Sequence, residues 1–227
     1  MSPAVNKKRP KTKPAYHHGN LMAAIRKTAL NFIAARGSVD FTMREIAADI
    51  GVTHGALYSH FDNKKALLED LAVFSLQTLQ DKQRQSIKSC ENGLDKLEQL
   101  ALAYTHFARS QPGAYRLIFN INDPSAESST VAMARISATT LIVATISEAQ
   151  QEKFIVDGSI DMLAFTLWSA AHGLSHLILN EHVSPFDEAA KDIDYTIGFA
   201  LKRFLSGVAT ARGRKWLYSG SSEEMLS

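Results

Sequence analysis

The chain has 227 residues, of which 45% are hydrophobic, so it can bury a sizeable core and we do not expect global disorder. It contains no run of 18 consecutive apolar residues, and its basic start is not followed by an apolar segment. We therefore expect neither a transmembrane helix nor a signal peptide. The single cysteine, Cys90, cannot form an intrachain disulfide, which fits a reducing cytoplasm.

The net charge of +2 is unevenly distributed along the chain. Residues 1–62 carry nine Lys or Arg against four Asp or Glu, whereas the remainder carries sixteen against nineteen. A basic arm (residues 1–15) on a basic small domain is typical of proteins that bind polyanions, although a solvated tail would have the same composition. The basic residues of the arm are Lys7, Lys8, Arg9, Lys11 and Lys13.

The first predicted helix follows the arm. In residues 20–37, apolar side chains recur at helical spacing. Asn20 can cap the start of this helix, and Gly37 can end it in the left-handed conformation. The apolar stripe consists of Leu21, Ile25, Ala29, Phe32 and Ile33.

Two short helices come next. Thr42 and Glu45 form a capping box, in which the hydroxyl accepts from a backbone amide of the first turn and the carboxylate reaches back. Gly51 ends this helix after about two turns. Thr53 then caps a second short helix over residues 54–61. The inward residues of the second helix are Leu57 and Phe61.

Helical patterns continue to residue 208, separated by turn signals that contain Pro, Gly or Asn. No strand alternation is visible, so the sequence predicts an all-α protein of about nine helices. The polar stretch 212–227 is expected to form a frayed tail. The further helices are expected over residues 64–89, 93–110, 114–121, 128–151, 157–181 and 187–208.

The pair of short helices has the form of a helix-turn-helix, because a short turn with Gly51 joins them. The second helix of such a motif presents its N-terminal end to base edges in the major groove, and flanking side chains bind phosphates. An ordinary αα-hairpin inside a bundle is the alternative. The expected DNA contacts are Thr42, Arg44, Thr53, His54, Gly55, Ala56, Tyr58, His60 and Lys64.

The sequence FTMREIAADIGVTHGALYSHFDNKKALLEDL, which starts at Phe41, resembles the DNA-binding domain of the TetR family of transcriptional regulators. The resemblance covers about residues 16–70. His54 departs from the family pattern, in which arginine or another polar residue is frequent. The matching positions are Thr42, Ile46, Ala47, Gly51, Val52, Thr53, Leu57, Tyr58, His60, Phe61, Lys64, Leu67 and Leu68.

Two further stretches are similar to a TetR subgroup whose C-terminal domain carries a Trp…His-Gly signature. They are YHHGNL at residues 16–21 and LWSAAHGLSHL at 167–177. The resemblance implies that the second domain, residues 63–211, binds a small molecule, although Trp168 could equally belong to the core. The expected ligand-binding residues are Tyr104, Phe107, Tyr115, Phe119, Trp168, His172 and His176.

Metal binding and catalysis are less favoured. His172 and His176 stand four residues apart on one helix, a spacing that can place two imidazoles on one metal ion. No Cys, Asp or Glu on the same face completes such a site, so we expect no metal. The chain has no Gly-x-Ser-x-Gly elbow and no phosphate-binding glycine loop, so we expect neither enzyme activity nor a cofactor.

Two segments, 158–180 and 188–208, carry wide apolar faces that could pair about a two-fold axis as a four-helix dimer interface. The alternative is that both faces belong to the core of a single chain. The expected interface residues are Ile193, Ile197, Gly198, Leu201, Phe204 and Val208.

These features predict a cytoplasmic one-component regulator. Residues 16–62 would bind double-stranded operator DNA, while a homodimer of the helical domains binds an unidentified small molecule, with no membrane involved. The resemblance implies a repressor that its ligand releases by shifting the helix after Asn63. An activator of the same architecture, and a metal- or ligand-binding helical protein without DNA function, are the alternatives.

Overall fold

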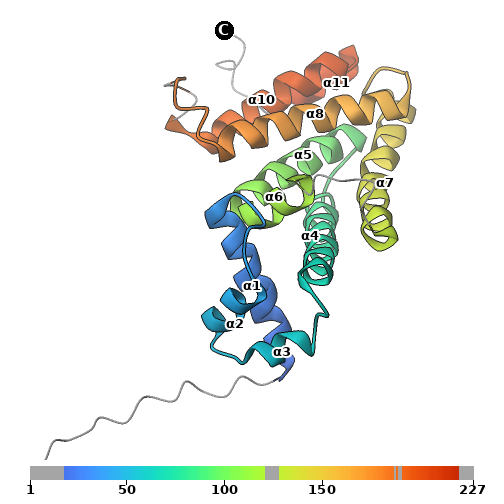
Figure 1. Ribbon diagram of the computed structural model, residues 1–227. Helices are drawn as coiled ribbons and strands as arrows, with labels where there is room; N and C mark the ends of the chain where they lie inside the picture. The colour runs from blue at the N-terminus through green and yellow to red at the C-terminus, as the bar shows by residue number, and fades with distance from the viewer. Residues whose placement is uncertain (1–17, 121–127, 187, 189–190, 220–227) are drawn as a thin grey trace, which may run out of the picture.

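The computed structural model describes residues 18–120, 128–186, 188 and 191–219 (Figure 1). Within these ranges it contains ten helices, one more than expected, and no strand beyond an isolated β-bridge between Ile155 and Ala209. The predicted all-α fold is confirmed. The basic arm, Ile121 and the last eight residues of the expected tail lie outside the described residues.

Helices α1 (His18–Arg36), α2 (Met43–Ile50) and α3 (His54–Tyr58) form the N-terminal lobe at the bottom of Figure 1. Both expected glycine stops are present, because Gly37 and Gly51 have φ values of 68° and 81°. Helix α1 begins two residues before the Asn20 cap that we expected, and α3 ends at Tyr58 rather than at Phe61.

Helix α4 (Lys64–Ser86) leads from the N-terminal lobe into the C-terminal lobe, which contains α5 to α11 (Figure 1). The side chain of Asn63 caps α4 by accepting a hydrogen bond from the backbone amide of Ala66 at 2.9 Å. The next elements are α5 (Gly93–Ser110), α6 (Pro112–Asn120), α7 (Ser129–Gln151), α8 (Ile160–Leu179) and α10 (Ile193–Val208).

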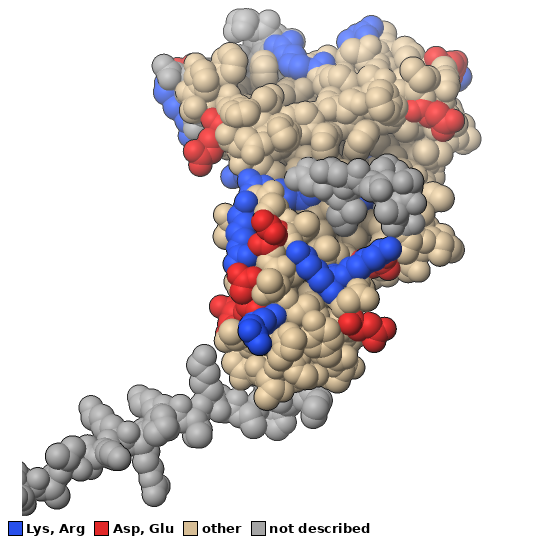
Figure 2. Space-filling model, viewed as in Figure 1, with Lys and Arg blue, Asp and Glu red and all other residues tan. Residues whose placement is uncertain are grey.

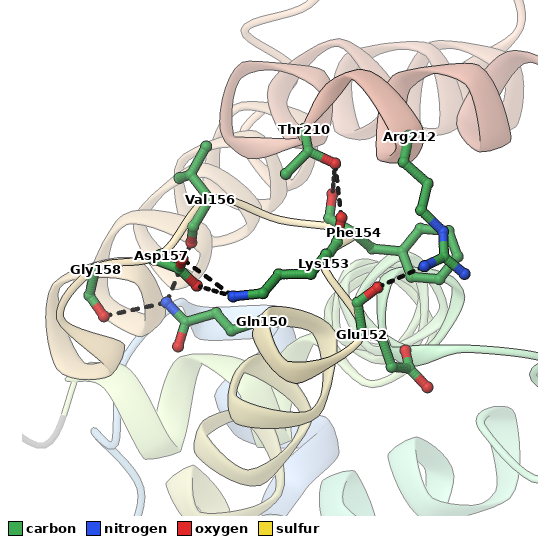
Figure 3. Close-up of polar contacts among 9 residues, drawn as sticks. All are labelled: Gln150, Glu152, Lys153, Phe154, Val156, Asp157, Gly158, Thr210 and Arg212. Carbon is green, nitrogen blue, oxygen red and sulfur yellow. Dashed lines mark hydrogen bonds and ion pairs between the residues drawn. The ribbon is translucent and has the colours of Figure 1, made fainter.

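The prediction of a frayed tail from residue 212 is wrong for the first part of that segment, because Ala211–Tyr218 forms α11. Figure 3 shows how the start of α11 is tied to the loop between α7 and α8. The hydroxyl of Thr210 donates to the carbonyl of Lys153 at 2.7 Å, and Nη1 of Arg212 donates to the carbonyl of Glu152 at 2.9 Å.

Three residues explain why this polar segment docks here. Leu217 is buried at 2% exposure, and Trp216 packs with its ring 6.4 Å from that of Phe154. At Gly213 a Cβ atom would overlap the carbonyl of Phe154, so the glycine allows close contact. The few apolar residues therefore outweigh the polar composition of the segment.

Candidate functional site

Helix α3 presents its N-terminal end to solvent. Thr53 caps it by accepting a hydrogen bond from the amide of Ala56 at 3.3 Å. Leu57 is fully buried and anchors the helix to the N-terminal lobe. Tyr58 is 43% exposed, and its ring contacts that of His54 edge to face at 4.6 Å. The expected inward position of Leu57 is confirmed, and Tyr58, which we expected at DNA, lies at the surface.

The other residues expected at DNA, in α3 and just after it, also lie at the surface. Gly55 is exposed, and a Cβ atom there would meet nothing within 4 Å, so backbone can be approached closely at this point. Ala56 and His60 are half-buried. This end of the molecule is therefore a small, mostly uncharged surface that could fit against a groove.

Thr42 is occupied by the capping box rather than left free for a partner. Its hydroxyl lies 2.9 Å from a carboxylate oxygen of Glu45, whose other oxygen accepts from Arg36 at 2.8 Å. The hydrogen bonds from Arg36 and Thr42 lower the pKa of Glu45 to about 2. Thr42 thus caps α2, Glu45 links α2 to α1 through Arg36, and Arg44 on α2 is exposed.

Lys64 stands at the first position of α4, where the helix N-terminus favours phosphate. Its Nζ atom lies 4.8 Å above the ring of the buried Phe41. This cation–π contact connects the start of α4 to the N-terminal lobe.

The C-terminal lobe contains a cavity of about 480 Å³ between α4, α5, α7, α8 and α10. Its walls are predominantly apolar. Three residues that we expected at a ligand, Tyr104, Phe119 and Trp168, line it. A cavity of this size and lining is typical of small-molecule sites.

The remaining expected ligand residues do not line the cavity. Phe107 is fully buried in the core of the C-terminal lobe and is not among the residues that line the cavity. His176 is exposed on α8, one helical turn beyond His172. Tyr115 is buried and, with His172, lies behind the lining aromatics.

His172 is the centre of a hydrogen-bonded aromatic cluster. Its Nδ1 atom lies 2.8 Å from the hydroxyl of Tyr104 and 3.0 Å from that of Tyr115. The ring also stacks on Tyr115 and meets Phe119 edge to face, with centroids 5.6 Å and 4.9 Å away. His172 therefore positions Tyr104 and Phe119, which line the cavity directly.

The protonation states of this cluster are set mainly by burial. Burial lowers the pKa of His172, and the nearby His176 lowers it further. Burial raises the pKa of Tyr104 and raises that of Tyr115 to about 12. All three groups are consequently neutral at pH 7, so Nδ1 can accept a hydrogen bond from a tyrosine hydroxyl.

Sequence reasoning missed several cavity residues. Leu76 of α4, Ala138 and Ile142 of α7, and Phe165 of α8 all line the cavity. Phe165, three residues before Trp168 on the same helix, was detectable from the spacing. The α7 residues were harder to find, since nothing in a nearly uncharged helix shows which of its faces borders a cavity.

The stripe expected at the dimer interface belongs largely to the chain's own core. Ile197 and Leu201 are buried against α5 and α8, and Leu201 and Phe204 line the cavity. Ile193 and Val208 are half-buried. The prediction was wrong for the buried residues because the most apolar face of α10 packs inward. Gly198 is half-buried with open space around it.

Helices α8 and α10, which pack against each other, also expose apolar residues. These residues are called the outer face and are Met162, Gly173, Leu177, Tyr195 and Phe199. Met162 and Tyr195 are 64% and 57% exposed. In the space-filling view, charged side chains are sparse across much of the upper lobe (Figure 2).

Helix α6 connects the cavity to the N-terminal lobe. Phe119 near its end lines the cavity. In its middle, Arg116 donates from Nη1 to the carbonyl of Ala34 in α1 at 2.9 Å. A Cβ atom on Gly113 would overlap the carbonyl of Leu30, so α6 and α1 are in close backbone contact.

Among the described residues, no group of three or more His, Cys, Asp or Glu is arranged to hold a metal ion. Helices α7 and α8 have mean hydropathies of 1.4 and 1.3 and are long enough to cross a membrane by length and composition. Because one or two such helices also occur in soluble proteins, this is weak support for a membrane span. Both helices border the cavity, which accounts for part of their apolar composition.

Comparison with known proteins gives consistent matches. The family model of bacterial regulatory proteins, tetR family, matches residues 25–71, and that of the tetracyclin repressor-like C-terminal domain matches residues 97–198. The nucleoid occlusion factor SlmA of Salmonella paratyphi B is 28% identical over 94 residues, which are 41% of this chain and 48% of SlmA. The chain thus spans about half the length of the curated relatives it matches.

Two solved structures share the fold. A protein with unknown function from Rhodococcus sp. RHA1 is 24% identical, with a TM-score of 0.75 over 87% of this chain and 100% of that one. A bacterial regulatory protein in the tetR family from Rhodococcus RHA1 is 21% identical, with a TM-score of 0.68 over 84% and 97%. With both of its domains matched by family models, the chain belongs to the TetR family of bacterial regulatory proteins.

Proposed function

We propose that the chain is a cytoplasmic, ligand-responsive repressor of transcription that leaves its operator when a small molecule enters the C-terminal lobe. The observation that carries the proposal is the combination of an exposed helix-turn-helix with an apolar cavity of about 480 Å³ in one chain. An activator of the same architecture remains the alternative. No enzyme activity, metal, cofactor or membrane is part of the proposal.

Operator binding would use the N-terminal end of α3. His54 and Gly55 would face base edges, while Tyr58 and Lys64 would contact phosphates on either side. Thr42 would act indirectly by orienting α2 through its capping box. The basic arm adds charge for the phosphate backbone.

A homodimer would bind through the outer face rather than through the stripe first expected. The exposed aromatic residues Tyr195 and Phe199 on α10, together with Met162 on α8, would be buried by a second copy. Gly173 and Gly198 have open space around them and would allow close helix approach. The two α3 helices of the dimer would need a separation of about 34–36 Å to enter successive major grooves.

Two helices can transmit ligand binding to α3. Helix α4 carries Lys64 at the DNA end and Leu76 at the cavity, about 18 Å away at 1.5 Å per residue. Helix α6 carries Phe119 at the cavity and Arg116 at α1. A ligand that favours a different position of these helices would change the separation of the two α3 helices and weaken simultaneous docking.

The test is operator binding by the full-length chain, measured by fluorescence anisotropy with duplexes selected for binding. We expect Phe199→Glu on the outer face to give a monomer by light scattering and to lose most operator affinity. The exposed Lys191→Glu, on the segment before α10, is the control and should leave the dimer intact. Tight operator binding by a monomer would contradict the proposal.

The ligand-responsive part has its own readout. Once an inducer is found, Trp168 fluorescence should respond to it, and His172→Ala should blunt induction while operator binding is retained. If His172→Ala instead abolishes operator binding or folding, the residue has only a structural role. If a chelator abolishes induction and zinc restores it, metal ligation by His172 and His176 replaces the organic inducer.

A further inference from the structure

The lining of the cavity specifies what it accepts. We propose that the cavity takes an uncharged, predominantly apolar molecule, which enters between α7 and α8 and places its one polar group at the hydroxyl of Tyr104. This inference rests on the ligand-responsive part of the proposed function and adds the chemical class of the ligand and its route.

The charge balance of the walls argues against an ionic ligand. Of the described residues that line the cavity, only Arg135 and Asp161 carry a full charge, and their signs cancel. Asp161 is exposed in the first turn of α8, at the rim. Arg135 already takes part in an interaction within the protein. A charged ligand would therefore lose its hydration without gaining a dedicated partner.

The polar groups of the interior are few and are neutral. The hydroxyl of Tyr104 is fixed by its 2.8 Å contact with Nδ1 of His172. The side-chain amide of Gln83 donates to the carbonyl of Leu100 at 3.5 Å. The hydroxyl oxygen of Tyr104 and the side-chain amide of Gln83 keep hydrogen-bonding capacity that a single hydroxyl or amine of a ligand could use. Tyr104 is the better anchor because two neighbours, His172 and Tyr115, hold it in place.

Exposed aromatic side chains mark the mouth. Phe165 and Trp168 line the cavity, yet they are 60% and 39% exposed, with their rings 6.2 Å apart. Across from them on α7, Thr139 is exposed and also lines the cavity. Large apolar groups at a rim attract an apolar molecule before it is fully buried. The opening between α7 and α8 is therefore the route in.

A matched pair of probes tests the class. N-phenyl-naphthylamine is uncharged and fluoresces in apolar surroundings, and anilinonaphthalenesulfonate has the same ring framework with an added sulfonate. We expect the full-length chain to bind the uncharged probe at least about tenfold more tightly. Decanol should then displace it better than decanoate or decylammonium. Equal or tighter binding of the sulfonate, or better displacement by either ion, would overturn the inference.

Paired variants show whether the probe is in the cavity. Ala138 lines the cavity, whereas Ala144 on the same helix is exposed and does not. We expect Ala138→Phe to weaken probe binding at least about tenfold and Ala144→Phe to leave it unchanged. Circular dichroism checks the fold, and Ala164→Phe, from the α8 wall, replaces Ala138→Phe if the latter does not fold. Probe binding that survives the cavity-filling variant overturns the assignment.

The route is tested by kinetics. In a Trp216→Phe background Trp168 is the only tryptophan, so its quenching by the probe reports arrival at the mouth. Phe165→Ala should lower the association rate several-fold, while Met133→Ala, which changes an exposed apolar residue of α7 away from the cavity, should not. Equal rates for both variants and the wild type would exclude this route.

Operator binding, measured on the same preparation, separates this inference from the proposed function. If the chain binds operator DNA but prefers the charged probe, the regulatory function is supported and the uncharged ligand class is contradicted. If the chain binds the uncharged probe in the cavity but does not bind DNA, the ligand class is supported and the regulatory function is contradicted.

Discussion

The two lobes differ in how completely they are filled. The N-terminal lobe closes around Ile25, Ile46 and Leu57, each with 0% exposure. The C-terminal lobe contains a cavity of about 480 Å³ and leaves large apolar side chains such as Phe165 exposed. In the proposed function this difference separates two tasks. A tightly packed lobe presents a fixed surface to DNA, whereas a partly empty lobe can repack around an incoming molecule.

The lobes communicate only if their junction is stiff enough to carry a displacement. Helix α1 is held to α4 by the paired hydrogen bonds of Arg26 with Asp70, at 2.9 and 2.8 Å, and the guanidinium also lies over the ring of Phe74. Helix α6 adds the contacts of Gly113 and Arg116. The largest predicted effect is therefore at this junction.

Gly113→Ala should break the contact between the lobes. The new methyl group would overlap the carbonyl of Leu30, a backbone atom that cannot move alone, so we expect a loss of about 2–3 kcal/mol of unfolding free energy. Gly207→Ala is the control, because a Cβ atom there meets nothing within 4 Å. Urea unfolding of both variants measures the difference, and equal stabilities would show that the junction is loose.

Removal of residues 1–14 should affect DNA binding but not the C-terminal lobe. The deletion takes away five positive charges, so nonspecific affinity for duplex DNA should fall by roughly tenfold or more at low salt, while folding is retained. Anisotropy titrations at several salt concentrations measure this. An unchanged affinity at low salt would mean that the arm is a passive tail.

Single phosphate contacts of the N-terminal lobe should have smaller effects. Lys64→Ala should weaken binding to all duplexes similarly and reduce the salt slope by about 0.9, since one ammonium group is lost. Tyr58→Phe removes only a hydroxyl and should cost about 1 kcal/mol of binding without changing the slope. Salt titrations of both variants test this, and a Lys64→Ala protein with the wild-type slope would contradict the docking mode.

The smallest predicted effect is a pH dependence of the C-terminal lobe. The pKa of His172 is lowered below its ordinary value of 6.5, so just below pH 6.5 the unfolded chain takes up a proton that the folded chain does not. The free energy of unfolding should therefore decrease as the pH falls through this window. The groups around His172 are Tyr104, Tyr115 and His176, and neither tyrosine titrates there.

Urea unfolding of the wild type and of His172→Asn, compared at several pH values, isolates this contribution from the other histidines. The variant should show the shallower pH dependence. An identical pH dependence in both proteins would mean that His172 titrates normally.

The N-terminal lobe was predictable because local interactions determine it. The capping box of Thr42 with Glu45, the cap at Thr53 and the glycine stops at Gly37 and Gly51 each depend on residues within a few positions of one another. Only the helix ends differ from the prediction. Helix α3, for example, ends three residues earlier than expected.

The C-terminal lobe was predictable in its helices but not in their neighbours. Long-range packing decides which apolar face of α10 turns inward. The sequence predicted a dimer contact for Ile197 and Leu201, and the fold instead buries both residues inside the chain. For the same reason Phe107 was expected at a ligand but packs in the core. The docking of α11 depends on the loop between α7 and α8, far from it in the sequence (Figure 3).

In the proposed function, two copies of this chain read DNA with paired α3 helices. The selection of bound sequences from a random duplex pool by the full-length protein tests this. We predict that the enriched sequences are two-fold symmetric, with half-sites about one helical turn, 10–10.5 base pairs, or a multiple of it apart. A pool without sequence enrichment, or with enriched single half-sites and no symmetry, would contradict the account.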